Sequence, residues 1–504
     1  MRSSKALKNL ISNLFLQITT AAVGFVITNY FILTYGSEMN GLLSSIRQFI
    51  NFILIVEAGI SAASVFALFS PLAEKNEKKI NAVLSATNIL YFRSGYIFGI
   101  LLLILSVLYS LFTNSTSQFI TFALVIILGA NGVTEFFLVG KYRVLLTADQ
   151  KSYVVSIVQA IATLLAALIS VILMKLGFNV IFVQAAYTIV YLSRSLIIYY
   201  YVKKKYSLIN HKVQPEMLAL ENKKDVLIHQ IAGLVVNSTP IVILTIFTNF
   251  KEVSVYTIYQ MVIYAVYLII NSFKNGLMAS FGEIIAKGDT KTLLKSYNTF
   301  ESFYYIVLSW AYTCASILIL PFISIYTHEV EDVDYIRPTI AVLFIIVGVC
   351  NNIRVPQMTL VTAAGHYKET RYRALLEALI NIIVSLTLVN HFGIIGVLLG
   401  SVCSFAYRTT DFIIYASKNI LKQSPIKTIK RLLANIILSI IPITVFIFIF
   451  PLQVNNMVDW ILYALIVGIV TLVTFILGNF VVDSSTMKEI ISRIKIVRNH
   501  LVKR

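Results

Sequence analysis

The chain has 504 residues, of which 58% are apolar and only 13% are charged, and its mean hydropathy is +0.83. A soluble globular protein carries about twice that share of charged residues to keep its surface wet, so the composition excludes a soluble multidomain protein and indicates a polytopic membrane protein. The net charge of +18 is compatible with a nucleic-acid binder or with basic cytoplasmic loops, and the distribution of the charges decides between the two.

Apolar runs of about 20 residues, long enough to cross a bilayer core, recur along the whole chain. We expect fourteen spans, at 11–34, 43–68, 89–111, 119–140, 153–175, 180–201, 228–249, 254–282, 302–326, 338–364, 374–390, 394–415, 432–450 and 458–479. The longest break holds two lysine clusters and is predicted to be a cytoplasmic linker. The fold class expected from this pattern is an all-α polytopic membrane protein.

The basic residues outside the spans are concentrated in the loops on one side of the membrane. If the N-terminus is cytoplasmic, the outer loops contain only Lys175, Lys251 and Arg337, and nearly all other loop Lys and Arg fall inside. This asymmetry is the pattern of cytoplasmic loops in membrane proteins. We therefore expect both termini in the cytoplasm and no binding to nucleic acid.

Short matches recur at a nearly constant distance along the chain. The run 145–148 (LLTA) resembles 360–363 (LVTA) at an offset of 215 residues, and 197–199 (IIY) resembles 413–415 (IIY) at an offset of 216. Both matches fall on equivalent places in spans 1–6 and 7–12, which predicts a parallel repeat of two six-helix lobes with a central cleft. The expected segments are an N-terminal lobe at 1–202, a cytoplasmic linker at 203–226, a C-terminal lobe at 227–416, two extra helices at 417–480, and a basic amphipathic cytoplasmic tail at 481–504.

No catalytic or metal-binding constellation stands out in the sequence. The cysteines, Cys314, Cys350 and Cys403, lie in apolar runs, and the six histidines are scattered. No phosphate-binding loop with its Lys and Ser or Thr is present. We expect a secondary transporter without an ATPase of its own, without a catalytic or metal site, and without a cofactor.

A charged side chain inside a bilayer is costly and normally faces a cavity or a partner. The basic residues that meet this description all lie on even-numbered spans, and we interpret them as candidates for binding an anionic substrate: Arg47, Arg194, Lys274, Arg354 and Arg408. Pairing with neighbouring carboxylates is the alternative for each. For Arg408 the neighbour is Asp411, three residues further along the same helix.

Two of the acids inside spans are candidates for coupling, and one span contains a predicted break. Glu57 and Glu135 are candidates for coupling to a proton or cation, with a purely structural counter-charge as the alternative. The stretch 351–357 (NNIRVPQ) places polar side chains and a proline inside the tenth span, which indicates an interrupted helix. In the tail, Thr486 and Glu489 have the spacing of a capping box.

The stretches 35–42 (YGSEMNGL), 57–60 (EAGI) and 71–73 (PLA) resemble bacterial polysaccharide repeat-unit flippases of the Wzx type. Their superfamily also holds drug and cation antiporters and lipid-linked peptidoglycan-precursor flippases. The resemblance covers spans 1–12 and departs at Pro240, where many relatives carry an acid. It implies that Arg47 and Lys274 occupy positions on helices 2 and 8 where related lipid-precursor flippases carry functional basic residues.

The resemblance implies a flippase that moves undecaprenyl-diphosphate-linked oligosaccharide from the inner to the outer leaflet for capsule, O-antigen or exopolysaccharide assembly. It further implies a bacterial cytoplasmic membrane, partners such as a polysaccharide polymerase and other assembly proteins, and coupling to a proton or sodium gradient. Three alternatives stay open: a peptidoglycan- or teichoic-acid-precursor flippase, a drug or cation antiporter, and a membrane-embedded glycosyltransferase or polymerase.

Overall fold

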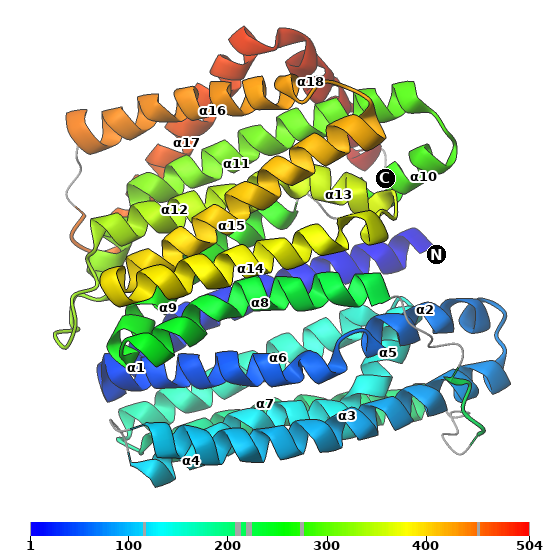
Figure 1. The fold of residues 1–504 in the computed structure, drawn as a ribbon, viewed down its shortest axis with the longest axis vertical. Helices are drawn as coiled ribbons and strands as arrows, with labels where there is room; N and C mark the ends of the chain where they lie inside the picture. The colour runs from blue at the N-terminus through cyan, green and yellow to red at the C-terminus, as the bar shows by residue number, and fades with distance from the viewer. Residues whose placement is uncertain are drawn as a thin grey trace. The chain divides into compact units, whose positions relative to one another are not determined.

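The computed structural model describes residues 2–113, 117–206, 213–217, 224–272, 277–450 and 454–502, and these residues contain helices and no strand. The chain packs as two compact units, Met1–Ser254 and Val255–Arg504. The first unit holds α1 (Arg2–Ile53), η1 (Leu54–Glu57), α2 (Ile60–Ala73), α3 (Glu77–Phe112), α4 (Gln118–Thr134), η2 (Glu135–Val139), α5 (Gly140–Ala148), α6 (Ser152–Lys175), α7 (Val180–Lys205) and α8 (Lys224–Phe247) (Figure 1).

α9 (Phe250–Ser272) begins at the end of the first unit and continues into the second. The second unit further holds α10 (Leu277–Ala286), α11 (Thr290–Tyr326), α12 (Pro338–Ile353), α13 (Val355–Ala363), α14 (Tyr367–Phe392), α15 (Ile394–Tyr415), η4 (Ala416–Leu421), α16 (Ile426–Thr444), η5 (Val445–Ile449), α17 (Met457–Val482) and α18 (Ser484–Val502). The predicted lobe and linker boundaries rest on the repeat and stay predictions.

Thirteen helices among the described residues are long and apolar enough to cross a membrane. The first of them, Leu7–Glu57, has 51 residues and covers the first predicted span and the first part of the second. At about 1.5 Å per residue it is more than twice as long as a bilayer core is thick. Its backbone leaves the helical region at Gly36, where φ is +84°, and the chain turns back there (Figure 1). The expected multi-pass, all-α membrane fold is confirmed.

The two halves of the chain interrupt corresponding helices. In the first unit, the π-helical turn η2 separates α4 from α5, and in the second unit the chain breaks at Arg354 between α12 and α13. α5 and α13 both have nine residues, and their first and last residues stand 215 apart in the sequence. This distance equals the offset between the two matching runs that these helices contain, so the repeat extends from sequence to secondary structure.

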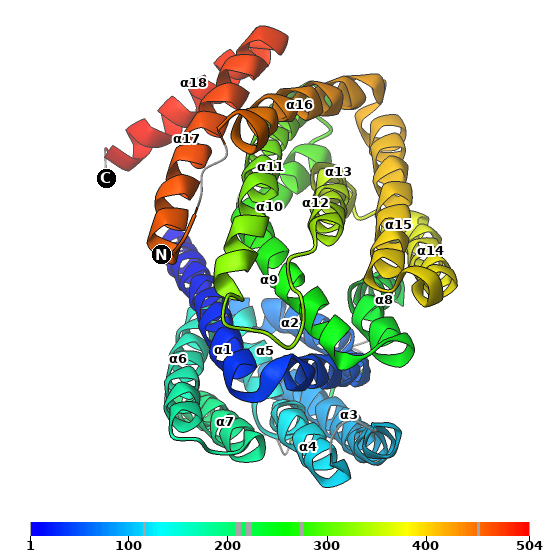
Figure 2. The same cartoon turned by 90° about the vertical axis from the view of Figure 1, so that its left-hand side faces the viewer.

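Close packing between helices depends on small residues. A Cβ atom added at Gly132 or Gly140 would lie 2.4 Å from the ring of Phe98 or Tyr91 on α3. A Cβ at Gly400 would lie 2.1 Å from the Ser385 hydroxyl, where α15 packs on α14. In lipid, where helix association depends on such fits, these glycines let the helices approach each other (Figure 2).

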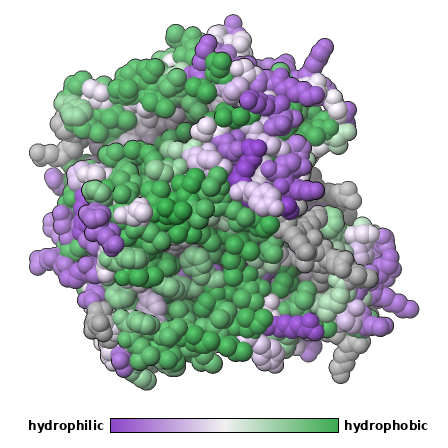
Figure 3. Space-filling model, viewed as in Figure 1, coloured by the Kyte–Doolittle hydropathy of each residue, from purple (hydrophilic) through white to green (hydrophobic). Residues whose placement is uncertain are grey.

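The membrane-facing surface is apolar along the helices. The second unit alone exposes many large apolar side chains on α16 and α17, including Ile437, Ile440, Leu465 and Leu477. In Figure 3 the sides of the helices in view are mostly hydrophobic, and hydrophilic residues gather toward the helix ends. This distribution is the one that lipid requires, since exposed apolar area on this scale is rare on a soluble protein.

The tail helix α18 begins earlier than the predicted capping box would place it. Asp483 is the cap, because its carboxylate accepts hydrogen bonds from the backbone N–H of Thr486 at 3.1 Å and from the Thr486 hydroxyl at 2.7 Å. Thr486 is therefore inside the helix, and the predicted capping box is wrong. Met487 and Ile490 are buried against α11 and α17, so this end of the tail belongs to the packed second unit.

Candidate functional site

The first unit contains a buried charged cluster built on two helix interruptions, named here the first-unit cluster: Glu57, Tyr91, Glu135, Arg143 and Arg194. Glu57 ends the 3₁₀ turn η1, and Glu135 begins the π-helical turn η2. Arg143 on α5 lies between them. Its Nη2 donates to Glu57 Oε1 at 2.8 Å, and its Nε lies 3.1 Å from Glu135 Oε1. One guanidinium thus joins the two interruptions.

The two carboxylates of this cluster are not held equally. Glu57 Oε1 also accepts a hydrogen bond from the Tyr91 hydroxyl at 2.7 Å. Glu135 is 91% buried, its Oε1 makes no hydrogen bond among the described residues, and its Oε2 lies 3.9 Å from Arg194 Nη2. The charged form of Glu135 is therefore the less well stabilised of the two.

A row of side chains on α7 leads away from this cluster. Arg194 lies over the ring of Tyr191 at 4.2 Å, and Tyr191 stacks on Tyr187 with ring centroids 6.0 Å apart and an interplanar angle of 15°. Arg47 on α1 is exposed, and Tyr187 is the ionisable group that interacts with it electrostatically. Among the described residues, Arg47 has no carboxylate partner.

The second unit contains a larger group of charges, named here the second-unit cluster: Arg354, Arg373, Glu377, Arg408 and Asp411. Glu377 on α14 forms ion pairs with Arg354 at the break after α12 and with Arg408 on α15, the latter at 3.5 Å. The predicted helix-face pair is confirmed, because Arg408 Nη1 donates to Asp411 Oδ2 at 2.7 Å. Three guanidiniums and two carboxylates leave this cluster with one excess positive charge.

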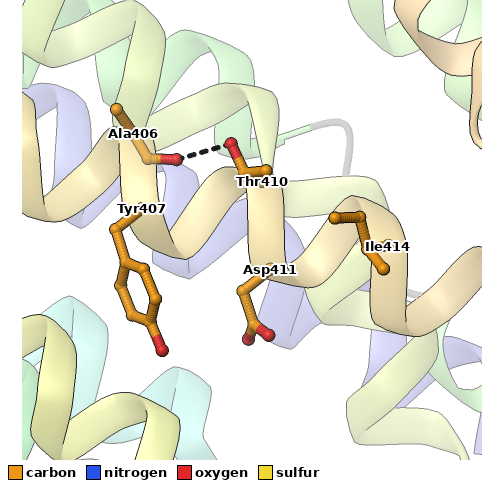
Figure 4. A pocket seen from close by; sticks show the side chains of 5 residues that line it. All are labelled: Ala406, Tyr407, Thr410, Asp411 and Ile414. Atoms are coloured by element: carbon orange, nitrogen blue, oxygen red, sulfur yellow. Dashed lines mark hydrogen bonds between the residues drawn. The ribbon is translucent and has the colours of Figure 1, made fainter.

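Asp411 is the member of the second-unit cluster that lines a surface pocket. Its other oxygen pairs with Arg373 on α14. Asp411 also lines an open pocket of about 480 Å³ on one face of α15, together with Tyr407 and Thr410 (Figure 4). Arg408 itself is 1% exposed, so the charge that this pocket offers directly is the carboxylate.

Of the six predicted site residues that the structure describes, five lie in one of the two clusters and one lies in neither. Glu57, Glu135 and Arg194 meet in the first-unit cluster, and Arg354 and Arg408 meet through Glu377. Arg47 joins neither cluster by an ion pair. Lys274 lies outside the described residues. The predicted roles of all seven in binding or coupling stay predictions.

The predicted interruption of the tenth span is confirmed at Arg354. The polar side chains around it face inward. Asn352 donates to the Tyr312 hydroxyl at 3.0 Å, and Gln357 donates to Glu301 at 2.9 Å. Pro356 stands at the start of α13, where a missing N–H is tolerated. The break is therefore lined by protein.

Several residues in these networks were not expected from the sequence. Glu377 lies ten residues inside α14, because α14 starts at Tyr367 and not near residue 374. The basic residues Lys368, Arg371 and Arg373 lower the hydropathy of its first turns, so that the predicted span begins too late, at residue 374. Arg143 was counted as a loop residue for the same reason. The spacing of Arg373 and Glu377, four residues apart, places both on one face of a helix and could have directed attention to this site, although Arg373 pairs with Asp411.

A third network with a fully buried acid was also missed. Glu301 on α11 is 0% exposed and pairs with Arg431 on α16 at 2.8 Å. It also accepts hydrogen bonds from the Thr428 and Tyr297 hydroxyls, at 2.7 and 3.0 Å. Arg431 reaches Asp483, the cap of α18, at 3.4 Å. This network joins α16 and the tail helix to the centre of the second unit. Among the described residues, no group of three or more His, Cys, Asp or Glu is placed to hold a metal ion.

Comparisons with known proteins identify the fold. No protein-family model matches the sequence, and no curated protein matches it with significant similarity. The structure is similar to lipid II flippase MurJ in an inward closed conformation, with a TM-score of 0.64 and 16% identity over 91% of this chain and 97% of that chain. It is also similar to a multidrug resistance MATE family transporter in an outward-facing conformation, with a TM-score of 0.58 and 14% identity over 83% of this chain and 96% of that one.

A third similar structure is a MOP superfamily transporter from Pyrococcus furiosus described by the reverse polarity of its binding pocket. Its TM-score is 0.53, with 13% identity over 83% of this chain and 96% of that chain. Nearly the full length of each solved chain is matched. The protein is therefore a multi-pass membrane protein with the fold that these flippases and transporters share.

Proposed function

We propose that the protein is a flippase that carries a lipid-linked oligosaccharide, attached through a diphosphate to undecaprenol, across the membrane by alternating access. The observation that carries this proposal is Arg47. It is an exposed residue on a membrane-spanning helix and has no carboxylate partner among the described residues. An arginine in that setting is costly unless an anion visits it, and a diphosphate accepts paired hydrogen bonds from guanidinium groups.

The fold supports the proposal without deciding the cargo. A structurally similar protein is a lipid II flippase, and lipid II names a lipid-linked substrate. The excess positive charge of the second-unit cluster suits an anionic head group. The lipid tail would remain in the bilayer while the head group crosses, and no covalent bond would be formed or broken.

The same proposal covers location and partners. We place the protein in a bacterial cytoplasmic membrane, with both termini in the cytoplasm, because the basic loops lie on that side. A polysaccharide polymerase and other assembly proteins would act on its product. Coupling to a proton or sodium gradient would use Glu57 or Glu135.

The alternatives differ in the chemistry of the cargo. A precursor flippase for peptidoglycan or teichoic acid would use the same cationic groups and differ in the sugar. A drug or cation antiporter is supported by the similarity to a multidrug transporter, but its cationic cargo fits poorly beside an unpaired arginine. A glycosyltransferase or polymerase would lengthen the saccharide, which a flippase does not.

The decisive experiment uses proteoliposomes that contain a fluorescent undecaprenyl-diphosphate oligosaccharide in both leaflets. A membrane-impermeant reductant bleaches the outer leaflet, and a flippase makes the inner pool accessible as well. We expect the native protein to expose that pool and Arg47→Ala to slow its exposure about tenfold or more, as expected from the loss of one charge-assisted hydrogen bond. Arg47→Lys should retain a good part of the rate.

Arg93→Ala is the matched control. Arg93 is also an exposed arginine, on α3, and belongs to neither cluster, but it lies near the end of its predicted span at 89–111, where its side chain can reach the membrane interface without a bound anion. Its rate should equal that of the native protein. Native protein that fails to expose the inner pool, or an Arg47→Ala variant as fast as Arg93→Ala, would contradict the proposal. Uptake of a cationic dye or elongation of the saccharide would favour one of the other classes.

A further inference from the structure

The first-unit cluster contains an arginine whose charge is only loosely matched. Arg194 and Glu135 are separated by 3.9 Å, beyond hydrogen-bond distance, whereas Arg143 and Glu57 form a 2.8 Å hydrogen bond. The Nε of Arg194 and Oε1 of Glu135 are both buried atoms without a hydrogen-bond partner among the described residues. Arg143 and Glu57 are thus joined by a hydrogen bond, whereas Arg194 and Glu135 are close but not hydrogen-bonded.

The cluster holds two arginines and two carboxylates, and Arg143 is shared between the carboxylates. It is hydrogen-bonded to Glu57 at 2.8 Å and lies 3.1 Å from Glu135, whereas the carboxylate near Arg194 is Glu135 alone, at 3.9 Å. If Glu135 takes up a proton, Arg143 keeps Glu57 and its hydrogen bond, and a full positive charge is left on Arg194. The other groups near Glu135 do not replace that lost negative charge, since they are Arg143 on α5, Tyr191 on α7, and Glu57, which is already bonded to Arg143 and to Tyr91 on α3.

Arg194 is also connected to the site proposed above. Its guanidinium stacks on Tyr191, Tyr191 stacks on Tyr187, and Tyr187 interacts electrostatically with Arg47. Tyr187 and Arg194 are seven residues apart, which is about 10 Å along a helix. The side chain of Arg194 is 14% exposed, so it is not sealed from a ligand. Two guanidiniums therefore bracket a stacked aromatic pair in one unit.

We propose that Arg194 is a switched phosphate ligand, held by Glu135 while that carboxylate is ionised and released to the substrate's diphosphate when Glu135 takes up a proton from water. This proposal rests on the proposed function and deepens it, because it names the residue that links proton uptake to substrate binding. By reciprocity, a diphosphate bound at Arg194 favours the protonated form of Glu135. Tyr187 and Tyr191 keep Arg194 on the side of Arg47.

The test measures binding by the purified full-length protein in nanodiscs. The probe is a short-chain prenyl diphosphate disaccharide, a diphosphate diester whose own charge does not change over the pH range that the protein tolerates near neutrality. We expect the native protein to bind it about tenfold more tightly at the acidic end of that range, which corresponds to the gain of one charge-assisted contact. Glu135→Gln should bind tightly at every pH, and Arg194→Ala weakly at every pH.

Two further variants make the result specific. Glu57→Gln should keep the pH dependence, because Glu57 already has Arg143 and Tyr91 as donors. Arg194→Lys should recover part of the pH dependence that Arg194→Ala loses. Monodisperse elution and a native-like melting temperature of Glu135→Gln confirm that the variant is folded, since glutamine has the shape of the residue that it replaces.

The outcomes separate this inference from the proposed function. Native protein that does not bind the probe at any pH contradicts the proposed function. Native protein that binds it with the same affinity at every pH leaves the proposed function standing and overturns the switch. A pH dependence that survives in Glu135→Gln, or disappears in Glu57→Gln, also overturns the assignment of the switch to Glu135 and Arg194.

Discussion

The first-unit and second-unit clusters are built in a similar way, but their net charges differ. Each one places arginines beside an interrupted helix, with Arg143 following the π-helical turn η2 and Arg354 standing at the break before α13. The last helix of each predicted six-helix lobe carries an arginine, Arg194 on α7 and Arg408 on α15, and the two are separated by 214 residues, close to the repeat offset. The repeat therefore extends to charged side chains within the membrane.

The difference lies in how tightly these two arginines are held. Arg408 is 1% exposed and is shared between Glu377 and Asp411, whereas Arg194 has a single carboxylate at 3.9 Å. Arg408 is therefore part of the packed core, and Arg194 is held by fewer contacts. In the switch proposed above, the two related positions of the repeat would have different roles, one structural and one in substrate binding.

The largest effect is expected for Glu377→Ala. Glu377 is the carboxylate that Arg354 and Arg408 share, and its removal leaves the buried Arg408 with Asp411 alone and takes away the carboxylate that pairs with the half-buried Arg354. Breaking a buried ion pair from one side costs about 3–5 kcal/mol. We expect a large loss of thermal stability in detergent. The exposed pair of Glu283 and Lys287 provides the control, and Glu283→Ala should melt with the native protein. Equal melting of both variants would contradict the structural role of the second-unit cluster.

A smaller effect is expected in the first-unit cluster, where the bridge is one arginine. Arg143→Ala removes the cation between Glu57 and Glu135 but leaves Glu135 near Arg194 and Glu57 bonded to Tyr91. A double-mutant cycle of Arg143→Ala with Glu57→Ala should give a coupling free energy of about 0.5–3 kcal/mol in thermal or chemical unfolding. Additive effects would show that the 2.8 Å contact contributes no net stability.

Much of the fold could be predicted from the sequence, because the bilayer leaves few choices for a chain this apolar. Composition and run length predict the spans, and the matching runs predict the correspondence between α5 and α13. What could not be predicted is which side of a helix a charge faces. Arg47 and Arg194 look alike as arginines in apolar runs, yet one is exposed without a carboxylate and the other lies near Glu135.

Ion pairs between residues far apart in the sequence could not be predicted. Arg143 and Glu57 are 86 residues apart in the sequence, and Arg431 and Glu301 are 130 residues apart. No local spacing therefore predicts either pair. The local pair of Arg408 and Asp411, three residues apart, was predictable. The start of α14 was missed for a related reason. Its basic first turns read as a loop by hydropathy, although the helix continues through them.

The smallest effect concerns the loop between α5 and α6 in the first unit, whose charges the second unit does not reproduce. Asp149, in the loop between α5 and α6, accepts hydrogen bonds from Lys151 and Tyr206 at 2.5 Å each and lies 3.5 Å from Lys5. The corresponding loop in the second unit, residues 364–366, has no carboxylate. Partial burial acts to raise the pKa of Asp149, but the hydrogen bonds and positive charges outweigh it and lower the pKa below its usual value of 3.8.

A carboxylate with a lowered pKa stabilises the folded state at pH values above its unfolded pKa, and this contribution disappears as the pH falls through the folded pKa. Asp149→Asn should therefore lower the melting temperature near neutral pH, by a modest amount because the side chain is partly exposed. The gap between variant and native protein should close as the pH falls below the usual range of an aspartate. A gap that stays constant down to acidic pH would show that Asp149 acts by its shape and hydrogen bonds alone and not by its charge.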